Sequence, residues 1–202
     1  MVKKAAWLGR GPAVSGVLAA VLATMLVAGG CSGDDEGEPT TTDSTGSASG
    51  GEAVPLQVTV GKVNGRIKAK DATAVATRVG AVVDGWWQAA YVGGKWPRTD
   101  FAHAFPGFTQ GAAADAKKDV ALMTNQTIGG QVSTVTAEVR KIAVDLLAAN
   151  QHAAAATARF TLIFTTTGKF AKQVTVQGQA FLTKGKEGNW KVFGYNVTRS
   201  SK

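Results

Sequence analysis

The chain has 202 residues with 22 Lys+Arg against 14 Asp+Glu, and these charges are unevenly distributed. Residues 1–31 carry three basic and no acidic side chains, residues 32–53 carry six acidic and no basic ones, and residues 54–202 carry 19 basic and eight acidic ones. The single cysteine, Cys31, lies outside the last segment, which excludes disulfides, cysteine nucleophiles and cysteine-based zinc sites there, and we expect neither a metal nor a cofactor.

The first segment is typical of a secretory signal, which we expect to span residues 1–30. Three basic residues precede an uncharged stretch, Ala13–Gly30, that is rich in Ala, Val and Leu and ends in small residues just before Cys31. This pattern resembles the lipobox of bacterial lipoproteins. The resemblance implies cleavage before Cys31, a diacylglyceryl group on its sulfur and attachment to the extracytoplasmic face of the cell membrane. An uncleaved transmembrane helix is the alternative, because 18 uncharged residues lie at the lower limit of a membrane span.

Residues 31–53 are expected to form a tether that begins at the lipidated cysteine. Residues 32–53 contain no Val, Leu, Ile, Met or aromatic residue, so they cannot bury enough apolar surface to offset the entropy of ordering, and we predict that they are disordered. The acidic run from Asp34 to Glu38 is either a solvated spacer or a weak electrostatic contact for the basic segment or a cation.

Residues 54–202 are predicted to form one domain that begins with a strand and a long helix. Leu56, Val58 and Val60 alternate with polar residues, which predicts a strand, and Asn64-Gly65 is a turn signal. Asp71 is a candidate N-cap for a helix over Ala72–Tyr91, where valines and a tryptophan recur at helical spacing.

The middle of the domain is expected to hold two shorter helices. The first covers Asp100–Phe105 and is ended by Pro106, because a residue before proline is disfavoured in helical geometry. Thr109 is a candidate cap for the second, whose apolar face includes Ala116 and Met123 and which ends near Thr127.

The last 70 residues change to the alternation of strands. Apolar residues alternate in one parity up to Val139 and in the other from Ile142, so we predict a β-bulge at Arg140-Lys141. Three further strands follow, near residues 154–164, 174–182 and 190–198, with short polar connections that favour antiparallel hairpins. The expected fold class is therefore α+β, with helices packed on one face of a curved antiparallel sheet.

The element order resembles that of the nuclear transport factor 2-like, or SnoaL-like, cone superfamily. The resemblance rests on the helix with an aromatic end, Val82–Trp87, on the aromatic loop that follows, on the bulged meander and on the closing strand that contains Trp190-Lys191-Val192. It implies a sheet curled around helices to form a cone with a pocket. The same fold hosts isomerases, cyclases, dehydratases and domains with no chemistry, so function has to be argued from the site.

Few side chains in the domain are candidates for acid–base chemistry. Asp100 and His103 would share one face of the predicted short helix, where the carboxylate would orient the imidazole for general-base catalysis. The other interpretation is that Asp100 caps the helix and His103 lies at the rim of an aromatic cluster. Asp84, beside two tryptophans, is either a desolvated acid or a surface residue between two buried positions, and His152 is expected in a solvated turn.

Aromatic residues are concentrated between positions 86 and 108. They either line a pocket for a hydrophobic or sugar-like ligand or fill the open end of the cone. The candidates are Trp86, Trp87, Tyr91, Trp96, Phe101, Phe105 and Phe108.

These features together predict a lipid-anchored, extracytoplasmic domain that binds or scaffolds rather than catalyses. The alternative is a small pocket enzyme or carrier for a hydrophobic ligand. A scaffolding domain would have an envelope protein as its partner. The excess of basic residues either predicts attraction to anionic lipid or anionic wall polymer or serves solubility alone. Nucleic acid is not expected, because an exported protein rarely meets it.

Overall fold

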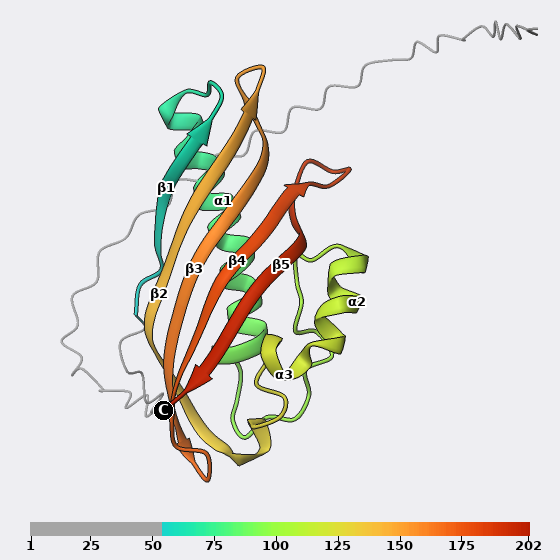
Figure 1. Cartoon of the computed structure of the whole chain (residues 1–202). Coiled ribbons are helices and arrows are strands. Elements are labelled where there is room, and N and C mark those ends of the chain that lie inside the picture. The colour runs from blue at the N-terminus through green and yellow to red at the C-terminus, as the bar shows by residue number, and fades with distance from the viewer. Residues whose placement is uncertain (1–53) are drawn as a thin grey trace, which may run out of the picture. The chain divides into compact units, whose positions relative to one another are not determined.

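The computed structural model describes residues 54–202, and the predicted signal sequence, Cys31 and the tether lie outside them. The described part is an α+β domain of five strands and a few helices (Figure 1). In chain order the elements are β1 (Gln57–Asn64), α1 (Ala69–Trp87), a π-helical turn (Gln88–Val92), α2 (Gln110–Lys118), α3 (Val120–Met123), a 3₁₀ turn (Gly129–Gln131), β2 (Val132–Ala149), β3 (His152–Gly168), β4 (Gln173–Lys184) and β5 (Trp190–Ser201).

The five strands form one curved, mixed sheet in the order β1-β2-β3-β4-β5 (Figure 1). Strands β2 to β5 make the predicted antiparallel meander. Strand β1 pairs parallel with β2, with Val58 opposite Ile142, so the prediction of a purely antiparallel sheet was wrong. The reason lies in the connection: the turn at Gly65, whose φ is 99°, leads into α1, and a helical crossover returns the chain to pair in parallel.

Helix α1 lies across one face of the sheet, and α2 and α3 lie beside β5 (Figure 1). The buried stripe of α1, which includes Val79, Val83 and Trp86, follows the predicted helical spacing. The helix begins at Ala69, so Asp71 is not its cap but lies in its first turn, where a carboxylate interacts favourably with the positive end of the helix dipole.

Close contact between α1 and β1 depends on Gly80. A Cβ atom added there would lie 2.6 Å from Cγ2 of Val58, well inside the contact distance of two carbon atoms. The glycine therefore allows the helix to approach the edge strand without a cavity or a clash.

The bulge that switches the apolar parity of β2 lies at Glu138 rather than at the predicted Arg140-Lys141. Ala137 pairs with Phe164 and Val139 with Ile163, so Glu138 between them has no partner on β3; a separate register shift lies at the start of the strand, between Val132 and Thr134. The extra residue moves Val139 to the face opposite α1 and turns Arg140 toward the helix. The switch of apolar parity was read correctly, but an arginine on the inner face could not be recognised from hydrophobicity.

The predicted helix over Asp100–Phe105 is not formed. These residues make turns, and Oδ1 of Asp100 accepts a hydrogen bond from the backbone N–H of Ala102 at 2.8 Å. An aspartate that binds its own backbone two residues on stabilises a turn instead of a helix. Thr109 does cap α2, since Oγ1 accepts from the N–H of Ala112 at 3.3 Å.

Candidate functional site

The space between α1 and the sheet is filled by aromatic rings. Trp86 is buried and makes edge-to-face contacts with Tyr91, Phe108 and Phe160 at centroid distances of 5.5, 5.8 and 5.5 Å. Its indole Nε1 donates to the backbone carbonyl of Met123 at 3.1 Å. Such contacts hold the rings in fixed mutual orientations, so this region is a packed core.

The remaining aromatic candidates extend the same cluster toward the surface. Trp87 is fully buried against Phe160, with their ring centroids 5.8 Å apart. Phe101 and Phe108 are buried. Trp96 is half-buried against Phe101, with ring centroids 6.3 Å apart, and Phe105 is half-buried against Phe108, with centroids 5.4 Å apart. Of the two expectations for these side chains, the geometry favours rings that fill the space over rings that line an open pocket.

Tyr91, the buried phenol of this cluster, acts as a hydrogen-bond donor. Its hydroxyl donates to the carbonyl oxygen of Leu122 at 2.8 Å. Burial raises the pKa of Tyr91, and the nearby Arg199 opposes this shift only in part, so the hydroxyl keeps its proton. The phenol therefore fixes α3 in place and is not poised to accept a proton.

Asp84 is bound to the inward-facing Arg140. Nη2 of Arg140 donates to Oδ1 of Asp84, and Nη1 donates to the carbonyl oxygen of Val54 at 3.0 Å. The side chain of Asp84 is 22% exposed and that of Arg140 is 12% exposed, so the ion pair is largely shielded from water. It links α1 and β2 to the segment that precedes β1, which gives Asp84 a structural partner on the inner face of the sheet.

Asp100 and His103 are not brought together on a helix face. Both side chains are exposed, and the Asp100 carboxylate is used by the backbone of Ala102. No hydrogen bond joins the two residues in the part of the chain that the structure describes. His152 is also exposed, at the start of β3. The structure thus separates Asp84, His103 and His152 into three different surroundings.

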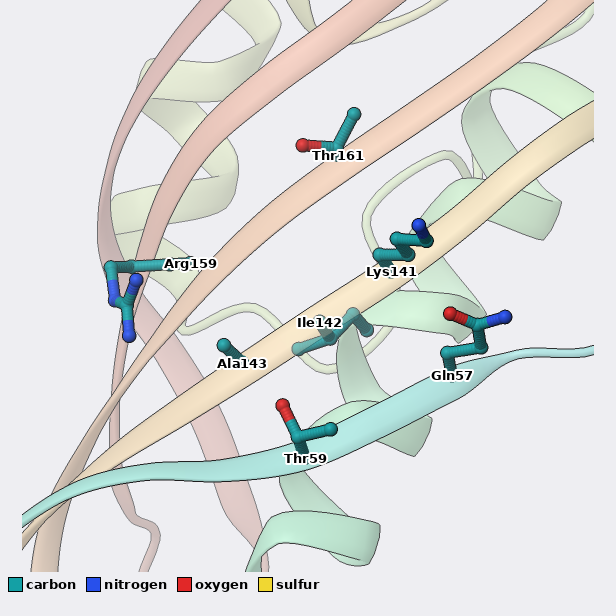
Figure 2. Close-up of a pocket in the computed structure, with 7 residues that line it drawn as sticks. All are labelled: Gln57, Thr59, Lys141, Ile142, Ala143, Arg159 and Thr161. Carbon is teal, nitrogen blue, oxygen red and sulfur yellow. The ribbon is translucent and has the colours of Figure 1, made fainter.

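A hollow of about 310 Å³ lies on the other face of the sheet, away from α1 (Figure 2). Mostly small and polar residues from three neighbouring strands surround it. These are Gln57 and Thr59 of β1, Lys141, Ile142 and Ala143 of β2, and Arg159 and Thr161 of β3. Five of the seven carry a hydrogen-bonding or charged group, so the hollow suits a polar molecule.

Arg159 at the rim of this hollow is held by Asp145. Nε and Nη2 of Arg159 donate to the two carboxylate oxygens at 2.8 and 3.0 Å, and the N–H of Lys62 donates to Oδ1 at 2.8 Å. The hydrogen bonds from Arg159 lower the pKa of Asp145, and the same contact raises the pKa of Arg159. The paired geometry fixes the guanidinium plane and leaves Nη1 outside the pairing.

Two further depressions are wider and lie at the ends of the domain. One, of about 430 Å³, lies between Arg78 and Val82 of α1 and the β4–β5 hairpin at Glu187. Another, of about 460 Å³, lies between Leu122 and Arg199. Arg199 donates to the carbonyl of Ala121 at 3.0 Å, so its guanidinium is occupied in joining β5 to α3. Neither depression contains the predicted acid–base residues.

Within residues 54–202 no three His, Cys, Asp or Glu side chains lie close enough together to hold a metal ion. None of the helices described is both long enough and apolar enough to span a membrane.

The fold and these sites define an α+β domain with one long helix on a five-stranded mixed sheet, closed on the helix side and hollowed on the other. Comparison of the chain with protein-family models, curated proteins and solved structures finds no match.

Sequence reasoning did not find the outer hollow. Its residues come from three strands, and the pairing register that brings Gln57 opposite Lys141 and Lys141 opposite Thr161 is not visible in the sequence. The signal in the sequence was the set of polar residues at alternate positions of each strand, between the apolar residues that predicted the core.

Proposed function

We propose that this protein is a lipid-anchored binding or scaffolding domain on the extracytoplasmic side of the cell envelope, with the cone fold of the nuclear transport factor 2-like superfamily. The observation that carries the proposal is the contrast at Trp86 and Ala143: the helix side of the sheet is filled by rings, whereas the opposite side is open and polar. A binding domain needs an accessible surface, and a pocket enzyme needs an accessible interior.

The chemistry of the chain's first segments supports the location. The residues before Cys31 are small, as a signal peptidase that cleaves beside a lipid-bearing sulfur requires. Two acyl chains on that sulfur would make membrane attachment stable, since each buried methylene contributes about 0.8 kcal/mol. The polar segment after Cys31 would then hold the domain near the membrane surface.

The charge of the domain supports an anionic partner. Residues 54–202 carry 19 basic and eight acidic side chains, and three of the acidic ones, Asp84, Asp115 and Asp145, are already in ion pairs. Anionic lipids and anionic wall polymers are the abundant negative surfaces of an envelope, and they attract such a domain at long range.

The anchor is tested by metabolic labelling with a fatty-acid probe and by membrane fractionation of the wild type and of Cys31→Ser. We expect label on the wild type only, and for Cys31→Ser a longer chain that keeps its leader. Because Cys31 is the only cysteine, no second thiol confuses the result. An unlabelled wild type, or identical processing of both chains, would show that the proposed location is wrong.

The binding function is tested by co-purification from native membranes with the anchor intact. We expect an envelope component to be retained by wild type and by His103→Ala alike, since His103 is exposed and away from the hollow. Loss of function in His103→Ala with unchanged stability would instead favour the pocket enzyme.

A further inference from the structure

The strand register places two polar rows side by side across the whole sheet. Directly paired residues can be followed from β1 to β5 without a gap. One row is Gln57, Lys141, Thr161, Gln177 and Thr198; the next row is Thr59, Ala143, Arg159, Gln179 and Asn196.

Both rows lie on the face opposite α1. Their positions alternate along the strands with the buried residues Val176, Ala180 and Val197, and directly paired residues point to the same face. Adjacent strands are about 4.8 Å apart, so four strand spacings give the rows a length of about 19 Å. Nine of the ten side chains are polar or charged, which makes a continuous polar track across the sheet.

The hollow lies at the β1–β3 end of this track because Ala143 is small. Thr59 and Arg159 are its direct neighbours in the same row, and their longer side chains rise on both sides of the methyl group (Figure 2). The hollow of about 310 Å³ is comparable to the smaller ligand pockets of proteins. The track therefore has one recess and a flatter extension toward β5.

Two cations flank the recess. Lys141 is exposed and makes no ion pair within the described part of the chain, and Arg159 is oriented by Asp145 with Nη1 outside that pairing. Of the neighbouring carboxylates, Asp145 is bound by Arg159, and Glu138 accepts a hydrogen bond from Gln173 at 2.6 Å. An anionic group in the recess would thus meet two cations and carboxylates that already have donors.

We propose that the polar track binds a linear anionic polymer of hydroxyl-bearing units, with one anionic group in the recess between Lys141 and Arg159 and the adjoining units along the amides and hydroxyls toward β5. Side-chain amides and hydroxyls both donate and accept hydrogen bonds, as polyol and sugar hydroxyls require. The inference names the partner of the proposed binding domain and rests on that function.

A lipid bilayer fits this track less well than a polymer does. Proteins that dock on anionic membranes insert apolar side chains beside their basic residues. The two rows contain no large apolar side chain, and the exposed Leu147 and Phe193 lie outside them. The recess between Lys141 and Arg159 admits a chain segment but not a flat layer. The observations therefore favour a polymer, and lipid binding becomes an outcome of the test.

The test uses the full chain purified in detergent and titrated with poly(glycerol phosphate) and, separately, with polygalacturonate. We expect one of them to bind, and the better one identifies phosphate or carboxylate as the anionic group. Lys141→Gln and Ala143→Phe should each weaken binding about tenfold, the first by loss of a charged hydrogen bond and the second by filling the recess. Lys117→Gln, which removes an exposed charge from α2, should change affinity less than about twofold.

Control ligands separate this inference from plain charge attraction. Inorganic polyphosphate carries charge without hydroxyls, dextran carries hydroxyls without charge, and a short-chain phosphatidylglycerol carries the lipid headgroup. Equal binding of polyphosphate, stronger binding of the phosphatidylglycerol, or equal effects of Lys117→Gln and Lys141→Gln would overturn the proposal.

Failure of this inference can be distinguished from failure of the proposed function. If neither polymer binds while wild type and Ala143→Phe retain the same envelope component, the polar track is not the ligand site and the binding function stands. If Cys31→Ser shows no defect in acylation or processing, the location fails even where a polymer binds in vitro.

Discussion

The two faces of the sheet are built from alternate residues of the same strands and differ in almost every property. On the helix side, Val144, Leu162 and Val176 are fully buried beneath α1. On the other side, their chain neighbours Ala143, Thr161 and Gln177 remain open to solvent to varying degrees. The difference separates two tasks: one set of residues holds the domain together, and the other set is free to bind.

The largest effect is expected from Trp86→Ala on the helix side. Loss of the indole removes three ring contacts and a hydrogen bond from a fully packed region, so the free energy of unfolding should fall by about 3–5 kcal/mol. Urea unfolding followed by tryptophan fluorescence or circular dichroism measures it. The matched control is Phe193→Ala on the outer face, where the ring is 53% exposed and a change within about 1 kcal/mol is expected. Similar losses for both variants would contradict the comparison.

The next effect concerns the ion pair on the helix side. Asp84→Asn should lower the free energy of unfolding by about 2–3 kcal/mol, because Arg140 is left largely buried without its counter-charge. The double variant Asp84→Leu with Arg140→Met should recover most of this loss. Asp115→Asn breaks the exposed pair with Lys118 and should cost almost nothing. A double variant as unstable as Asp84→Asn would show that the pair matters for more than charge balance.

A smaller effect is expected from the ion pair on the outer face when the pH is lowered. The pKa of Asp145 lies below its ordinary value of 3.8 because Arg159 donates hydrogen bonds to it. A lowered pKa in the folded state means that the ionised carboxylate stabilises the fold above about pH 4 and that this contribution is lost as the pH falls further. The free energy of unfolding in urea should therefore fall more between pH 6 and pH 3 for the wild type than for Asp145→Asn. The difference between the two falls should be less than about 1 kcal/mol, because the pair is partly exposed. An equal fall would assign the acid sensitivity to other groups.

The smallest effect on stability is expected from the polar track itself. Gln177→Thr keeps a residue suited to strands at an exposed position, so unfolding should change by less than about 0.5 kcal/mol. Affinity for the bound polymer should fall measurably in the same variant. A stability loss comparable to that of Trp86→Ala would mean that the outer face also holds the domain together.

Much of the architecture could be predicted from periodicity. The long helix, the four-stranded meander, its hairpins and the Thr109 cap all follow from local patterns of apolar and capping residues. The parallel pairing of β1 could not be predicted, because it depends on which strand is reached after a helix, and the sequence shows no sign of that choice.

The site was less predictable than the fold for two physical reasons. The aromatic candidates were identified, but whether rings enclose space or fill it depends on distances between segments such as α1 and β3, which meet only after folding. The Asp100–His103 pair assumed a helix that the local Asp100–Ala102 hydrogen bond replaces with a turn. Side chains aligned by strand register, such as Lys141 and Thr161, are 20 positions apart in the chain and give no local motif.

The unpaired residue Glu138 sets the orientation of the β2 residues that follow it. If Glu138 were deleted, Arg140 would point away from Asp84, and Lys141 and Ala143 of the recess would be turned toward α1. A substitution in this strand thus changes one side chain, whereas a change of length by one residue would invert the facing of the whole segment. We therefore expect homologous domains to differ in the residues of β2 but to keep the number of residues in this strand.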